Sequence, residues 1–149
     1  MDTQEYLDLK KFMGLFYDWY EKKPHHPPQA HPVIVLSQLE SRSPAKARSG
    51  LQMAINDLIE STLNWELSEV QSADVKMTAS GAPSLSQVRA KYSRKFAQLL
   101  KRGKIKNVEE YYLAKGIIDG AAYHFGDLDR NAILSMLEKF EQTVSWQQE

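Results

Sequence analysis

The residues of this sequence with the clearest chemical potential are eight basic side chains between positions 84 and 107, where no acidic residue occurs. The formal net charge of the chain is zero, so this cluster stands out against a balanced background. Clustered lysine and arginine attract phosphate groups and carboxylates. The stretch is therefore a candidate anion-binding surface. The alternative is a solvated helix face, whose basic residues suit the C-terminal end of the helix dipole.

The spacing of these residues predicts that most of them share one side of a helix over residues 85–102. On a helical wheel, five of them fall within an arc of about 120°, opposite an apolar stripe. Two more basic residues follow in the next turn of chain. The predicted basic face comprises Lys91, Arg94, Lys95, Lys101, Arg102, Lys104 and Lys106.

Arg89 differs from the other basic residues because it falls on the apolar side of the same helix, near Val88, Tyr92 and Phe96. A buried guanidinium without a partner is very costly, so an ion pair between helices is expected. The acidic C-terminal segment supplies the candidate partners Glu109, Glu110, Asp119, Asp127 and Asp129.

Other patterns that could bind a metal or perform catalysis are weak. His25, His26 and His31 lie in a proline-rich segment over 24–32, where neighbouring side chains point in different directions, so a solvated linker is favoured over a metal site. The run DLDRN at 127–131 opens like a calcium loop, but Ala132 and Leu137 occupy positions that require Gly and Glu. No phosphate loop or nucleophile motif occurs in the sequence. We therefore predict no metal, no cofactor and no catalytic residue.

The first helix, expected over residues 3–22, is rich in aromatic side chains. One interpretation is a well-buried helix. The other is an interface formed by Phe12, Phe16, Trp19 and Tyr20, which would favour a symmetric homodimer. The linker at 24–32 leaves the helix able to dock on its own domain, on a second copy or on a partner, and docking on its own domain is slightly favoured.

Length and composition indicate a soluble single domain. A chain of 149 residues with 42% apolar side chains can bury a substantial core. It contains no cysteine, which suits a reducing compartment. There is no signal-peptide pattern at the start and no apolar run of membrane-spanning length. These features predict a cytoplasmic protein that does not enter the membrane.

Hydrophobic periodicity predicts an all-α fold, a single-domain bundle of five to seven helices around a short central buried helix over 108–119. This central segment is apolar nearly all round, and Asn107 and Gly120 offer an N-cap and a left-handed stop. The other helices are expected over 3–22, from 32, and over 44–65, 67–80, 85–102 and 128–144.

These observations favour binding over catalysis. The leading expectation is a small non-catalytic protein-interaction or inhibitor protein, of the kind that immunity proteins and adaptors represent. It would bind a protein partner through its basic face, which suits an acidic protein, through its aromatic first helix, or through both. The alternative is a nucleic-acid-associated protein whose basic segment 85–106 contacts the phosphate backbone. The apolar helix after the basic segment, acidic in its first turn, argues against a helix-turn-helix reader.

Overall fold

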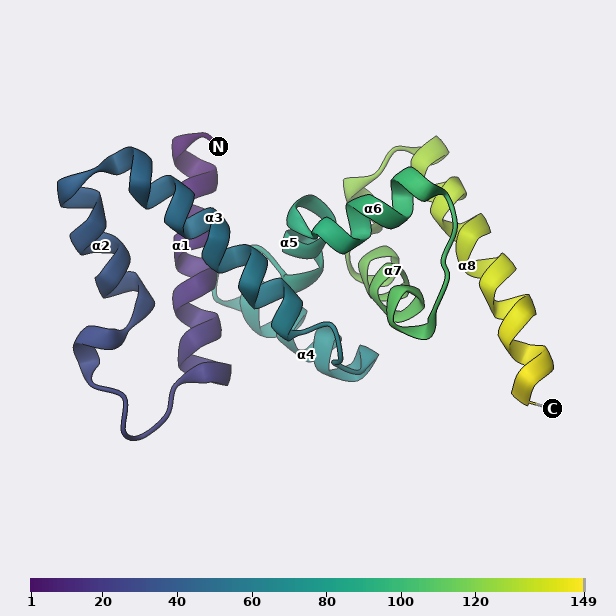
Figure 1. Ribbon diagram of the computed structural model, residues 1–149, viewed down its shortest axis with the longest axis horizontal. Helices are drawn as coiled ribbons and strands as arrows, with labels where there is room; N and C mark the ends of the chain where they lie inside the picture. The colour runs from purple at the N-terminus through teal and green to yellow at the C-terminus, as the bar shows by residue number, and fades with distance from the viewer. Residues whose placement is uncertain (149) are drawn as a thin grey trace.

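The computed structural model describes residues 1–148 of the chain, and side chains as far as residue 143. It is all-α and forms a single domain, with no strand among the described residues (Figure 1). The eight α-helices are α1 (Thr3–Phe16), α2 (Pro32–Arg42), α3 (Pro44–Ser61), α4 (Leu67–Ala79), α5 (Leu85–Tyr92), α6 (Arg94–Arg102), α7 (Val108–Ala121) and α8 (Asp127–Gln148). A π-helical turn (Tyr17–Glu21) continues α1, and short 3-10 turns occupy Pro28–Ala30 and Ala122–His124.

Side-chain caps define where several helices begin. Asp2 Oδ1 accepts a hydrogen bond from the Glu5 backbone N–H at 2.8 Å. Ser43, Ser84 and Asn107 accept from the backbone N–H three residues further along in the same way. Each cap satisfies a backbone donor that the first helical turn leaves without a partner. The helix starts expected at these four caps are therefore confirmed.

The expected helix over 85–102 is wrong in one respect, because the structure divides it at Ser93. The Ser93 backbone is extended (φ −67°, ψ 117°), and its Oγ accepts from the Phe96 N–H at 3.1 Å. The residue thus ends α5 and caps α6, which raises the number of helices to eight. Residues before and after Ser93 therefore do not share the faces that a single helical wheel over 85–102 assigns to them.

Two clusters of buried apolar side chains hold the helices together. The first joins α1, α2, α3, α4 and α5, with Phe12, Leu51, Ile55, Met77 and Leu85 at its centre. The second joins α6, α7 and α8, and its most buried members are Phe96, Leu99, Ala114, Ile117 and Ile133.

Helix α7 is central to the second cluster but is not buried on all sides. It packs against α4, α5, α6 and α8, and Leu113 and Ile117 are fully enclosed. Val108 and Tyr112 instead remain 52% and 46% exposed. The expectation of a helix buried all round is therefore wrong for the side that carries these two residues, because no helix covers it.

The aromatic first helix docks on its own domain. Phe12 and Phe16 are buried, and the Phe16 ring stacks on Trp65 at a centroid distance of 5.7 Å. The segment after the helix is also anchored, because the Tyr17 hydroxyl contacts His26 Nδ1 at 2.9 Å and His31 Nε2 contacts Asp18 Oδ1 at 3.0 Å. Residues 24–31 are thus anchored by hydrogen bonds to the end of the first helix, whereas a free tether was expected.

A buried polar junction lies where the two apolar clusters meet. Arg89 is 2% exposed, and its guanidinium donates to the Thr62 carbonyl oxygen at 2.6 Å and to Thr62 Oγ1 at 2.7 Å. Burial lowers the pKa of Arg89 to about 10, and the negative charge of Asp74 opposes that shift. The expected partner in the acidic C-terminal segment is wrong, because α5 turns Arg89 toward the end of α3 and toward α4.

Asp74 and Ser86 complete the junction between α4 and α5. The Ser86 backbone N–H and hydroxyl donate to the two Asp74 carboxylate oxygens at 2.8 and 2.6 Å. Burial raises the pKa of Asp74, while the Ser86 hydrogen bonds and the charge of Arg89 act in the opposite direction.

Gly120 brings α7 close to this junction. A Cβ at Gly120 would lie 2.4 Å from Ser86 Oγ and 2.6 Å from Asp74 Oδ2, so a larger residue would force these hydrogen-bonded side chains to move. The expectation that Gly120 stops the helix in a left-handed conformation is wrong, since the helix continues to Ala121 and Gly120 has no positive φ. Its function in the fold is close approach.

Truncation of buried α7 side chains should destabilise the protein. We expect Leu113→Ala and Ile117→Ala each to reduce the free energy of unfolding by about 2–5 kcal/mol, because both leave a cavity. Tyr112→Ala is the matched control, and its half-exposed ring should contribute about 1 kcal/mol or less. Urea denaturation measures all three, and equal losses would contradict the placement of α7.

The two glycines of α7 should respond differently to alanine. Gly120→Ala should destabilise by about 1–3 kcal/mol, because its Cβ overlaps Ser86 and Asp74. The nearest atom to a Cβ at Gly116 is 3.5 Å away, which is ordinary contact. Gly116→Ala should therefore be neutral or stabilising by about 0.5–1 kcal/mol, since alanine favours the helix. Thermal unfolding of both variants checks the contrast.

Candidate binding surface on helix α6 and the following loop

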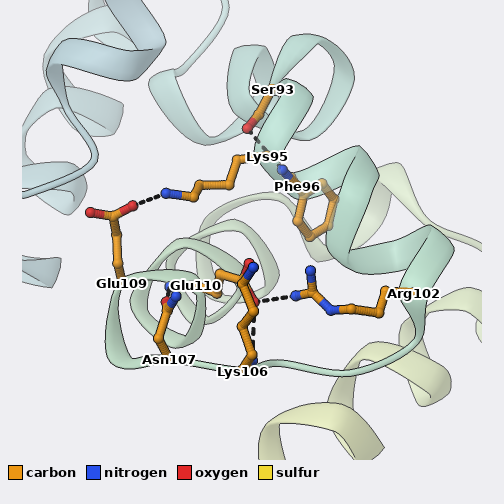
Figure 2. A network of polar contacts seen from close by, with 8 residues as sticks. All are labelled: Ser93, Lys95, Phe96, Arg102, Lys106, Asn107, Glu109 and Glu110. Carbon is orange, nitrogen blue, oxygen red and sulfur yellow. Dashed lines mark hydrogen bonds and ion pairs between the residues drawn. The ribbon is translucent and has the colours of Figure 1, made fainter.

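Two basic residues of α6 pair with the first turn of α7. Lys95 and Arg102 are seven residues apart and therefore lie on nearly the same side of the helix. The Lys95 ammonium pairs with Glu109, and the Arg102 guanidinium pairs with Glu110 (Figure 2). These two ion pairs tie α6 to the start of α7 and neutralise both acids there.

Glu110 organises the loop between the two helices, although a glutamate there reads from sequence as an ordinary first-turn acid. Its side chain is only 3% exposed, and Oε1 accepts the Lys106 backbone N–H at 3.0 Å as well as pairing with Arg102. The Glu110 N–H donates to Asn107 Oδ1 at 2.8 Å (Figure 2). The Glu110 carboxylate and the Asn107 N-cap thus fix the end of the loop where it joins α7.

Two further features fix the same loop. Gly103 adopts a left-handed conformation (φ 77°), which ends α6 and favours glycine. Ile105 is 3% exposed and inserts into the second apolar cluster. The alternating lysines on either side of Ile105 are exposed.

Four basic side chains remain available on this platform. They are exposed and make no hydrogen bond or ion pair among residues 1–143. We call them the basic surface, and they are Arg94, Lys101, Lys104 and Lys106. Of the other residues expected on this face, Lys95 and Arg102 are paired with α7. Lys91 belongs to α5, on the far side of the Ser93 break, and pairs with Glu5 of α1 at 2.9 Å.

The charge at the start of α6 opposes helix stability. Arg94 and Lys95 occupy the first turn, which contains no acidic residue. A helix N-terminus carries a partial positive charge, so each cation there costs about 0.3–1 kcal/mol where an acid would stabilise. This local conflict adds to the positive potential at the N-terminal end of the basic surface.

Two hollows lie beside the basic surface, and sequence reasoning did not identify either of them. The first, between α3 and α6, has a volume of about 460 Å³ and is lined by Asn56, Ile59, Glu60, Leu63, Tyr92, Ser93, Arg94, Lys95 and Gln98. The Tyr92 hydroxyl is buried without a hydrogen-bond partner among the described side chains. We refer to this space as the α3–α6 hollow.

The second hollow lies between the α3–α4 connection and the start of α7. It has a volume of about 640 Å³ and is lined by Leu63, Asn64, Trp65, Glu66, Leu67, Ser68, Val108, Glu109 and Tyr112. We refer to it as the α7 groove. The only signal for it in the sequence is that Val108 and Tyr112 fall on a different side of the helix from Leu113 and Ile117.

The aromatic residues expected to form an interface are mostly inside the chain. Phe12 and Phe16 are buried, and Trp19 is half-buried. Tyr20 is 38% exposed, and the Lys76 ammonium lies 5.2 Å from its ring centre and 4.7 Å from that of Trp19. Of the four aromatic side chains, only Tyr20 and part of Trp19 are therefore accessible, and both lie beside Lys76.

Neither a metal site nor a membrane-spanning helix is found among the described residues. Within the part of the chain that the structure describes, no group of three His, Asp or Glu side chains is arranged to hold a metal ion. None of the described helices combines the length and the apolar character needed to cross a bilayer.

Comparison with protein-family models, with curated protein sequences and with solved structures finds no match. Function is therefore inferred from the residues of this chain.

The loop should depend on Glu110 much more than on its neighbour. Glu110→Gln should reduce the free energy of unfolding by about 1–3 kcal/mol, because the buried acceptor of the Arg102 guanidinium and the Lys106 N–H loses its charge. The exposed Glu109→Gln is the matched control and should cost about 0–1 kcal/mol. Amide exchange at Lys106 should accelerate only in Glu110→Gln. Equal effects of the two changes would show that Glu110 does not hold the loop.

Proposed function

We propose that this protein is a small non-catalytic binding protein that attaches to an acidic region of another protein through the basic surface, as an inhibitor or adaptor would. The observation that carries the proposal is the set of four exposed cations, without a pairing partner among the side chains that the structure describes, on a helix and loop that Glu110 holds in place. A pre-organised surface loses less conformational freedom on binding. The absence of cysteine supports the further expectation that the protein works in the cytoplasm.

Carboxylates suit this surface better than a phosphate backbone does. Lys95 and Arg102 already bind side-chain carboxylates from α7, so their charges are satisfied within the chain. A nucleic acid lying along 85–106 would therefore gain neither of these cations, and it would not gain Lys91, which pairs with α1. The features of this region therefore favour an acidic protein over nucleic acid.

Charge reversal tests the proposal with defined probes. The variant Arg94→Glu/Lys101→Glu should bind a short peptide of glutamate and serine at least about tenfold more weakly, a change of about 1.4 kcal/mol, because two attractions become repulsions. The matched control is Lys23→Glu/Lys46→Glu, which changes the net charge equally at exposed lysines outside the basic surface. The control should bind as the wild type does, and fluorescence anisotropy measures each affinity.

A single-stranded oligonucleotide provides the competing probe. Binding to phosphates would make log affinity fall linearly with log salt, with a slope of about 0.7 for each phosphate contacted. Tighter, steeply salt-dependent oligonucleotide binding that the Arg94→Glu/Lys101→Glu variant abolishes would replace the proposal with a nucleic-acid function. Unchanged peptide binding after the reversal would discard the basic surface altogether.

A further inference from the structure

The α3–α6 hollow and the α7 groove are neighbours on one side of the molecule. Leu63 lines both of them. Lys95 lines the first, Glu109 lines the second, and the two side chains form an ion pair between the hollows (Figure 2). The two spaces thus form one furrow that this ion pair crosses.

The two ends of the furrow differ in chemistry. At the α7 groove, Val108 and Tyr112 expose about half of their surface, and Leu63, Trp65 and Leu67 are half-buried beside them. Exposed apolar side chains gathered in a concave site mark a place where another apolar group can be buried. A single Phe or Leu side chain of a partner would remove this surface from water.

The other end of the furrow is cationic on its α6 side. Arg94 and Lys95 line the α3–α6 hollow at the positive end of the α6 dipole, and Lys101 lies seven residues beyond Arg94 on the same side of the helix. Lys106 belongs to the loop and stands two residues before Val108, which lines the α7 groove.

Three acidic residues line the furrow, and their placement limits how a partner can lie. Glu60 is on α3, opposite the cations, and Glu66 is engaged in the cap of α4, where its N–H donates to Glu69 Oε1 at 3.2 Å. Glu109 is neutralised by Lys95. Carboxylates of a partner would therefore be accepted along α6 and the loop, while its apolar side chain enters the groove.

The ion pair between the hollows can be exchanged at low cost. Its Lys95 and Glu109 side chains are 36% and 43% exposed, and pairs of that kind contribute little to stability. A carboxylate of the partner can replace Glu109 on Lys95 without leaving a buried charge unpaired.

From this arrangement we infer that the furrow receives an acidic segment of another protein that carries one large apolar side chain, with its carboxylates on α6 and its apolar side chain in the α7 groove. The inference rests on the proposed function and specifies the partner's binding segment. Charge complementarity along α6, together with the exposed apolar groove beside it, selects this occupant.

Two peptides test the inference, the glutamate–serine peptide and the same peptide with a central phenylalanine. We expect the wild type to bind the phenylalanine peptide about tenfold more tightly, because ring burial adds to the ionic contacts. Val108→Ser/Tyr112→Ser should abolish that gain and leave binding of the plain peptide unchanged.

The matched control is Val75→Ser/Tyr123→Ser, which removes a valine and a tyrosine that are each 69% exposed and do not line the furrow. This variant should retain the full preference for phenylalanine. Equal affinity of the wild type for both peptides would overturn the inference, as would equal loss of preference in the two serine variants.

Failure of the inference is distinguishable from failure of the proposed function. If both peptides bind equally and Arg94→Glu/Lys101→Glu weakens both, the basic surface stands and the groove is discarded. If neither peptide responds to that reversal, the proposed function fails.

A second copy of the chain is the other occupant to test. Leu128 is 87% exposed between Asp127 and Asp129, so the chain itself carries an apolar side chain flanked by carboxylates. Sedimentation of the free protein should show a monomer. A dimer that dissociates in both Leu128→Ser and Val108→Ser/Tyr112→Ser would assign the groove to self-association and overturn the inference.

Discussion

The buried guanidinium of Arg89 is the interaction on which the arrangement of this protein depends. A charge that is only 2% exposed requires close partners, and Thr62 provides a carbonyl and a hydroxyl oxygen while Asp74 provides the opposite charge. Thr62 follows α3, Asp74 belongs to α4 and Arg89 to α5, so one side chain fixes three helices. The two apolar clusters meet here, and Gly120 allows α7 to approach the same place.

The position of α7 in turn determines which charges of α6 are free. Because the first turn of α7 lies beside α6, its two glutamates bind Lys95 and Arg102. The buried Glu110 also accepts a hydrogen bond from the loop backbone, so the exposed lysines on either side of Ile105 belong to a loop of fixed conformation. A fold with no net charge thereby presents a local positive surface, because its acids and bases pair unequally in space.

The same packing leaves part of α7 uncovered. Helices α4, α5, α6 and α8 enclose Leu113 and Ile117, but the side that carries Val108 and Tyr112 faces the connection between α3 and α4 across a groove. Apolar surface beside exposed cations suits a partner that carries both acidic and apolar groups. The proposed function therefore rests on the apolar and cationic side chains that remain exposed when the core is packed.

Local chemistry was readable from the sequence alone. The all-α class and most helix starts follow from periodicity and from caps such as Asp2, Ser43 and Asn107, because these signals act within one or two turns of chain. The concentration of basic residues between 84 and 107 was equally evident, since charge is a property of composition.

Only the tertiary structure decided which of those residues are free and which are paired. Ser93 is as compatible with a continuous helix as with a cap, and packing selected the cap. Arg89 donates hydrogen bonds to Thr62, which is 27 residues away, and Lys91 pairs with Glu5 on α1. Side chains pair with the groups that the fold brings within a few ångströms. Sequence distance carries no information about such contacts, so the surface and the groove emerged only when the helices were in place.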